Sequence, residues 1–142
     1  MGVLPDLVHL LPIIAWALFG GGSMDAILRY AIAVPGLEPG VPAWVAFWSH
    51  HLHCTLHSAL VAGTVTLLLR PWWHQVGLPL AGWWSHILID VPTHSADFYP
   101  VPVLYPLTMR GFDGLAWNTP WFMVLNYTAL AICAYALWRR RA

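Results

Sequence analysis

The chain has 142 residues, of which 59% are hydrophobic and only 8% are charged. A soluble domain has about 25% charged residues, so this composition excludes an ordinary soluble enzyme and indicates an integral membrane protein. The six basic residues are all arginines and equal the acidic residues in number, and they form no basic patch of the kind that binds nucleic acid.

Four stretches are apolar and close to, or above, the roughly 20 residues that a helix needs to cross a bilayer core. Helices satisfy their own backbone hydrogen bonds in lipid, so we predict an all-α fold, a polytopic transmembrane helix bundle. The predicted spans are residues 3–20, 43–69, 72–91 and 119–138. We expect residues 1–142 to form a single integral-membrane domain.

Residues 23–34 form a shorter segment between GGG at 20–22 and PGLEPGVP at 35–42. Asp25 and Arg29 are spaced to pair across one helical turn. Its 12 residues are too few for an ordinary span, so a tilted or re-entrant half-helix and an interfacial helix both fit. The predicted bundle therefore has four long helices and one short or re-entrant helix.

Arginines set the expected orientation. Arg139, Arg140 and Arg141 follow the last span, which places the C-terminus in the cytoplasm, and Arg70 lies on the same side. The loop 92–118 then lies at the outer face of the membrane. Six tryptophans near the span ends are expected as interfacial anchors: Trp72, Trp73, Trp83, Trp84, Trp117 and Trp121.

The stretch WSHHLHCTLHSAL, residues 48–60, places four histidines in an otherwise apolar span. On a helix, His53 lies about 60° and His57 about 20° from His50, whereas His51 lies about 100° away. Three imidazoles therefore face one neighbouring helix. A lone histidine in a membrane is more often an interhelical hydrogen-bond donor than a metal ligand. His74 lies at a span end and is expected to be an interfacial residue rather than a ligand.

The other spans carry matching polar pairs. His86 and Asp90 are four residues apart, and Asp6 and His9 are three apart, so each pair shares one helix face. Ionisable side chains in spans are costly and usually mark a functional site, and imidazole with carboxylate suits zinc or a similar divalent ion. The candidate ligands are Asp6, His9, His50, His53, His57, His86 and Asp90.

This set is larger than one mononuclear site requires. Either two metals bind, or some of the carboxylates orient histidines rather than bind the ion. Asp6 and Asp90 are also the candidate catalytic residues. A bound divalent ion polarises a carbonyl or phosphoryl oxygen and lowers the pKa of water to roughly 7, so the set indicates hydrolysis.

Three segments carry a resemblance to a known family. GVLPDLVHL (2–10) looks like a G-x-x-x-P-D-x-x-H element, and HCTLHSAL (53–60) looks like an element in which a histidine precedes Thr-His-Ser by a few residues. The third segment, GWWSHILIDVPTHSADFYPVPVLYP (82–106), looks like Ser-His-x-x-x-Asp followed by a Pro-rich aromatic loop that ends in Tyr-Pro. In this order the segments resemble the bacterial and archaeal family of membrane-bound metal-dependent hydrolases, small inner-membrane proteins distantly similar to zinc-dependent phospholipase C.

The resemblance implies a metal site formed by Asp6, His9, His53, His57, His86 and Asp90. Two features depart from the family pattern: Leu52 stands where a histidine is expected, so that His51 or His53 would have to substitute, and the chain begins almost at the Pro-Asp element, where the family has an additional helix. If Asp6 joins the other ligands near the outer face, the N-terminus lies outside and residues 23–34 return the chain across the membrane.

Two functions remain open. The first is a membrane-embedded hydrolase with a divalent metal, zinc by preference, that cleaves an ester or phosphodiester of a lipid substrate at the outer membrane face. The second is a non-catalytic small integral subunit of a larger respiratory, photosynthetic or transport complex. In one variant of the second, the histidines bind haem or a chlorin.

Overall fold

The computed structural model describes residues 4–31, 33, 37–97 and 100–141. Within these residues the fold is all-α, as the sequence predicts, and contains no β-strand. The elements are α1 (Leu4–Val8), α2 (Leu11–Phe19), α3 (Met24–Ala31), α4 (Ala43–Leu56), α5 (Ala59–Leu68), the 3₁₀ turn η1 (Arg70–Trp72), α6 (Trp73–Thr93) and α7 (Pro120–Arg139).

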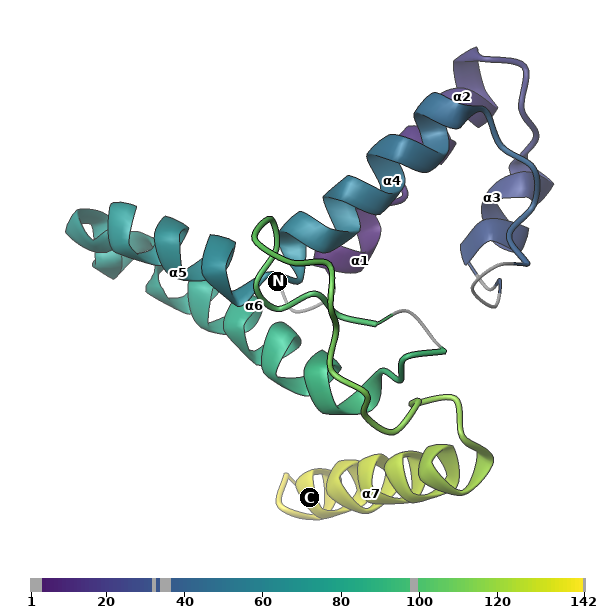
Figure 1. The fold of residues 1–142 in the computed structure, drawn as a ribbon. Helices are drawn as coiled ribbons and strands as arrows, with labels where there is room; N and C mark the ends of the chain where they lie inside the picture. Colours follow the sequence, from purple (N-terminus) through teal and green to yellow (C-terminus); the bar gives the residue numbers. More distant parts are fainter. Residues whose placement is uncertain (1–3, 32, 34–36, 98–99, 142) are drawn as a thin grey trace.

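The helices form two arms that meet at a corner (Figure 1). In one arm α4 packs against α1 and α2, and in the other α5 packs against α6. The helix α1 also contacts α6, and α3 packs against α2. The end of α1, the junction of α4 with α5 and the second half of α6 therefore meet at the corner.

The predicted span 3–20 is two helices rather than one unbroken helix over its described residues. Helix α1 ends at Val8, and α2 begins at Leu11 with Pro12 in its first turn. Proline has no backbone N–H and its ring clashes with the carbonyl four residues earlier, so Pro12 cannot continue α1 but is well placed to start α2. The break leaves Asp6 and His9 at the end of α1 that faces the corner.

The predicted span 43–69 is also divided. His57 ends α4, and Ser58 has an extended backbone (φ −85°, ψ 121°) that starts α5. The Ser58 hydroxyl accepts a hydrogen bond from the Val61 N–H at 3.2 Å, which is the arrangement of a helix N-cap. The expectation of one unbroken helix is wrong here because a serine that can cap the next helix follows the histidine.

Helix α6 covers the predicted span 72–91 almost entirely and continues through Pro92 to Thr93, past the proline where the sequence favours its end. Trp83 donates its indole N–H to the Leu56 carbonyl at 2.6 Å, and Trp84 donates to Thr66 Oγ1 at 3.0 Å. These two tryptophans, predicted as interfacial anchors, join α6 to α4 and α5 instead.

Helix α3 forms within the predicted segment 23–34. Residues 32 and 34 of that segment lie outside the described residues. The predicted pair is confirmed: Arg29 Nε lies 2.6 Å from Asp25 Oδ2 across one turn. The helix has eight residues and packs against α2, so it is too short to cross a bilayer as a helix.

The loop after α6 folds back over the end of that helix. Gly114 N–H donates to the His94 carbonyl at 2.8 Å, and Trp117 N–H donates to the Thr93 carbonyl at 2.8 Å. These bonds satisfy carbonyls that a helix end leaves open. A Cβ at Gly114 would lie 2.4 Å from the Pro92 carbonyl oxygen, so this close approach requires glycine.

Helix α7 is the one helix among the described residues that is long and apolar enough to cross a membrane, and it matches the predicted span 119–138. None of its residues is buried, and it extends away from the two arms (Figure 1). A packed bundle of four long helices, as the sequence predicts, is therefore not what the described residues form. Because α7 is apolar around its whole circumference, no single face directs it against the other helices.

Ser58 gives a direct test of the corner. Its buried hydroxyl caps α5 and also donates to the Tyr105 carbonyl at 2.7 Å, which holds the outer loop on the α4–α5 junction. We predict that Ser58→Ala lowers the free energy of unfolding by about 1–2 kcal/mol, since it removes a cap and the hydrogen bond that the hydroxyl donates to the half-buried Tyr105 carbonyl. The measurement is denaturant-induced or thermal unfolding in detergent.

Ser85→Ala is the matched control, because the Ser85 hydroxyl bonds only the Gly82 carbonyl on its own exposed helix turn. We expect a change below about 0.5 kcal/mol for this surface substitution. If Ser58→Ala and Ser85→Ala lowered the free energy of unfolding equally, the stabilising role of the Ser58 hydroxyl at the corner would be contradicted.

Candidate metal centre

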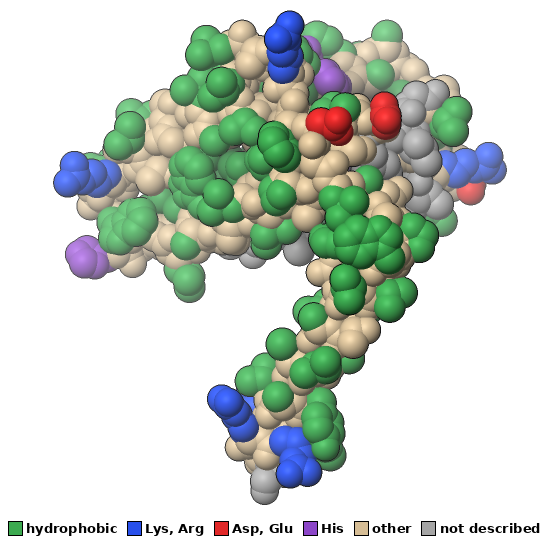
Figure 2. Space-filling view, turned by 60° about the horizontal axis from the view of Figure 1, so that its bottom comes forward, with side chains coloured by type: hydrophobic (Ala, Val, Ile, Leu, Met, Phe, Trp, Pro, Cys, Tyr) green, Lys and Arg blue, Asp and Glu red, His purple; other side chains and the backbone are tan. Residues whose placement is uncertain are grey.

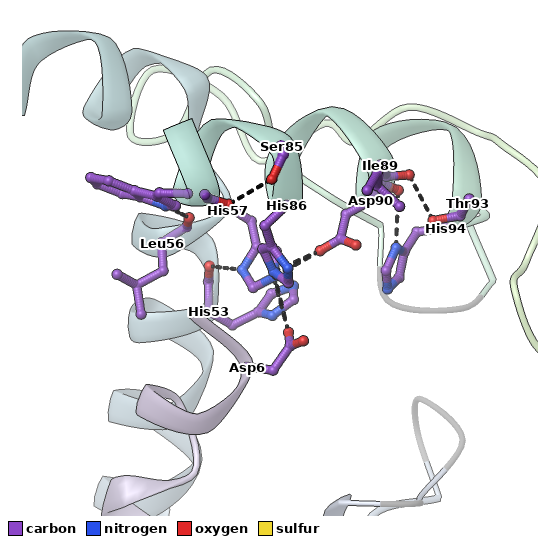
Figure 3. A network of polar contacts seen from close by, with 12 residues as sticks. Asp6, His53, Leu56, His57, Ser85, His86, Ile89, Asp90, Thr93 and His94 are labelled. Carbon is purple, nitrogen blue, oxygen red and sulfur yellow. Dashed lines mark hydrogen bonds and ion pairs between the residues drawn. The ribbon is translucent and has the colours of Figure 1, made fainter. Parts of the chain in front are cut away.

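His57 lies at the bend between α4 and α5, and its side chain is fully buried at the corner (Figure 3). Its Nδ1 lies 2.8 Å from the His53 carbonyl oxygen. A carbonyl oxygen only accepts hydrogen bonds, so Nδ1 carries the proton and donates it. In this neutral tautomer the available lone pair is on Nε2, so Nε2 is the atom that can bind a metal.

Helix α6 contributes two side chains to the same point. His86 and Asp90 are four residues apart on one face, and His86 Nε2 lies 2.9 Å from Asp90 Oδ2. Both side chains are largely buried. His86 Nε2 also lies 3.0 Å from His57 Nε2, so the two imidazoles meet through their far nitrogens.

Asp6 reaches the group from α1. Its Oδ1 lies 3.3 Å from His57 Nε2 and 3.5 Å from His86 Nε2. Half of the Asp6 side chain is exposed, in contrast to 1% for His57. Asp6 is therefore the member of the group that faces open space.

The four side chains Asp6, His57, His86 and Asp90, which we call the tetrad, could hold a metal ion. Their ligand atoms all lie within 4.8 Å of one another, and the five separations named here, including 3.2 Å from His57 Nε2 to Asp90 Oδ2, run from 2.9 to 3.5 Å. Tetrahedral zinc, with bonds of about 2.0–2.1 Å, separates its ligand atoms by about 3.3 Å. The tetrad fits an ion of this kind.

The hydrogen bonding of the tetrad also favours a cation. Among the described residues, Asp90 Oδ2 is buried and accepts no hydrogen bond of good geometry, although two imidazole nitrogens lie within 3.2 Å. A buried carboxylate oxygen without a directed partner is costly. A divalent cation between these atoms would balance both carboxylates and both nitrogen lone pairs.

The other predicted ligands lie around the tetrad rather than in it. The His53 ring packs at 4.1 Å from the His57 ring, and the His9 ring meets His53 edge-on at 5.4 Å, measured between centroids. His50 is exposed and contacts Cys54 Sγ through Nε2 at 3.6 Å. Among the described residues, the tetrad is therefore the one group that could hold an ion. This favours a single metal ion with further histidines beside it over a site with two metals.

A cavity of about 650 Å³ opens beside the tetrad. Asp6 and Asp90 line it together with His9, His53 and His94. His94 ends α6, and its Nδ1 lies 3.0 Å from the Asp90 carbonyl oxygen, so it donates there as His57 does to His53 (Figure 3). The cavity thus joins the candidate metal centre to a row of imidazoles.

Several cavity residues could not be found from the sequence. Tyr30 comes from α3, and Phe122 and Asn126 come from the first turns of α7. Nothing in their spacing links them to the histidines, because only tertiary structure places these side chains of α3 and α7 at the same cavity. Asn118 lines the cavity as well, whereas Asp113 accepts a hydrogen bond from the Ala96 N–H at 2.9 Å.

Comparisons with known protein families, with curated proteins and with solved structures gave no match. The fold and the site define an all-α protein with a candidate metal centre of two histidines and two aspartates. It carries one helix apolar enough to span a membrane among its described residues.

We predict that the purified protein binds one equivalent of a divalent metal and that His57→Ala or His86→Ala lowers the affinity more than about 100-fold. Loss of a group that only orients a ligand costs about 10- to 100-fold, so loss of a ligand should cost more. Elemental analysis after dialysis against graded chelator measures this. His74→Ala is the control, since His74 is exposed at the start of α6; equal metal loss in the control would contradict the site.

Proposed function

We propose that the protein is a membrane-embedded, metal-dependent hydrolase that cleaves an ester or phosphodiester of a lipid at the outer membrane face. One observation carries the proposal: four ligand atoms from α1, the α4–α5 junction and α6 converge beside a cavity of about 650 Å³. Zinc is the preferred ion, since imidazole nitrogen and carboxylate oxygen are among its usual ligand atoms.

The burial within the tetrad supports a division of roles. His57, His86 and Asp90 are the buried members, and a catalytic zinc site has three protein ligands and keeps another position available. A divalent ion held there would supply Lewis-acid polarisation of the scissile group and would lower the pKa of water. Asp6, half exposed toward the cavity, is then our candidate to accept the proton from the attacking water at its carboxylate.

The exterior of the helices supports the membrane location. Large apolar side chains stand exposed on several helices, with Phe19 88%, Leu78 86% and Leu67 72% accessible. A soluble monomer rarely exposes apolar patches of this extent. We therefore propose that α4 with α5, and α6, contact lipid as α7 does, and that Arg139, Arg140 and Arg141 keep the C-terminus in the cytoplasm of a bacterial or archaeal cell.

We predict that the zinc-loaded protein, mixed into liposomes of polar lipid extract, releases a cleavage product that mass spectrometry detects. Asp6→Asn should lower the rate at least about 100-fold, since removal of a general base costs about 10²- to 10⁴-fold, while metal content falls less than in His86→Ala. Asp25→Asn is the matched control, because Asp25 pairs with Arg29 on the exposed face of α3. Unchanged turnover in Asp6→Asn would remove Asp6 from the mechanism.

A second candidate function is a non-catalytic subunit of a larger membrane complex. The observation that favours it is the bare surface of α7, which a partner helix could cover. A bound haem or chlorin is not favoured at the tetrad, since ligand atoms within 4.8 Å of one another leave no room for a planar macrocycle.

We predict that the protein runs as a free species in native detergent extracts, with no visible absorption beyond its aromatic residues. Native gel electrophoresis and an absorption spectrum measure both properties. Migration in one stable complex of defined subunits, lost when the outward residues of α7 are replaced, would favour the subunit function instead.

A further inference from the structure

The cavity beside the tetrad has no permanent cation in its wall. Among the described residues that line it, Asp6 and Asp90 carry the formal charges, and none is an arginine. The neighbouring cavity of about 400 Å³ adds Glu38 and likewise has no arginine among its described lining residues. The chain contains no lysine.

The arginines lie elsewhere. Arg29 is paired with Asp25 at 2.6 Å, Arg70 belongs to η1 beyond α5, and Arg110 is exposed on the loop between α6 and α7. Arg139 ends α7 about 20 Å along that helix from Asn126, and Arg140 and Arg141 follow it. Figure 2 shows basic side chains at the outer edges of the molecule and at the tip of the projecting helix. An anionic substrate would therefore meet no arginine at the described cavity wall, where the imidazoles of His9, His53 and His94 are the basic side chains.

The charge balance of the tetrad then limits the substrate. A divalent ion and the two carboxylates of Asp6 and Asp90 sum to zero, so the loaded site would have no net positive charge to attract an anion. A phosphodiester carries one negative charge before any bond is broken. This charge would have to move from water into the cavity without an arginine to pair with it, which is unfavourable. An uncharged carbonyl group develops its negative charge only during the reaction, which is where the ion acts.

The remaining wall suits such a substrate. Leu10, Ile89 and Phe122 provide apolar surface against which an alkyl chain could pack. Asn118 and Asn126 supply uncharged amide donors at the same cavity. This combination of apolar surface with neutral donors is typical of a site for a neutral amphipathic molecule.

We infer that the scissile group is an uncharged carboxylic ester with an alkyl chain, rather than a phosphodiester. This inference rests on the proposed hydrolase function and selects one of the two bond types that the function leaves open.

The first test is binding, which needs no turnover. The zinc-loaded protein in detergent is titrated with N-methyldecanamide, which is uncharged, and with methyl decyl phosphate, a phosphodiester that carries one negative charge and has a similar chain. We expect the amide to bind at least about 10-fold more tightly by calorimetry. In Asn118→Arg, which places a cation at the cavity, the preference should shift toward the phosphate at least about 10-fold, whereas Asn118→Gln keeps it. An unchanged preference in Asn118→Arg overturns the inference.

The second test is turnover of p-nitrophenyl decanoate and of p-nitrophenyl decyl phosphate, each measured relative to the same substrate with Asp90→Asn protein. Metal-dependent cleavage of the ester alone supports the inference. Cleavage of the phosphate diester with an equal or larger acceleration overturns it and leaves the hydrolase standing. If metal binds and neither substrate is cleaved, both the hydrolase and this inference are wrong.

Discussion

The structure depends on one buried point at which polar atoms from three parts of the chain meet. His57 Nε2 and His86 Nε2 lie 3.0 Å apart, with a carboxylate oxygen of Asp90 and one of Asp6 within 3.5 Å. In an otherwise apolar protein, two carboxylates placed beside two imidazoles are unfavourable unless a cation or protons balance them. The helices around this point are arranged so that those atoms meet, and His57, His86 and Asp90 are buried there.

The bend between α4 and α5 makes this convergence possible. A straight helix over 43–69 would carry α5 past the corner and away from α6. At Ser58 the chain turns, because the Ser58 hydroxyl caps the start of α5. Trp83 donates a hydrogen bond to the Leu56 carbonyl, which the bend leaves without a helical partner. The same serine holds the loop after α6 through Tyr105, so the position of the candidate ligand His57, the direction of α5 and the placement of the loop are coupled through one residue.

The site and the surface of the protein belong to one physical arrangement. The tetrad holds two of the six acidic side chains, and large apolar side chains are exposed on several helices. In the proposed membrane location, this exterior would meet hydrocarbon while the polar centre is shielded from it. A neutral, chain-bearing substrate could enter this environment from the lipid without losing hydration, which joins the proposed location to the proposed chemistry.

The sequence by itself determined the all-α class, the position of α7, the Asp25–Arg29 pair and the four members of the tetrad within a candidate set of seven. Composition, apolar length and the spacing of polar residues along a helix are local properties, so they can be read from the chain. Only the tertiary structure decided that His9, His50 and His53 stand outside the tetrad, that Pro12 and Ser58 divide two expected helices, and that Tyr30 and Asn126 line the cavity. Helical periodicity specifies which side chains share a face but not which helix that face will meet, because the meeting is set by bends and packing between residues far apart in the sequence.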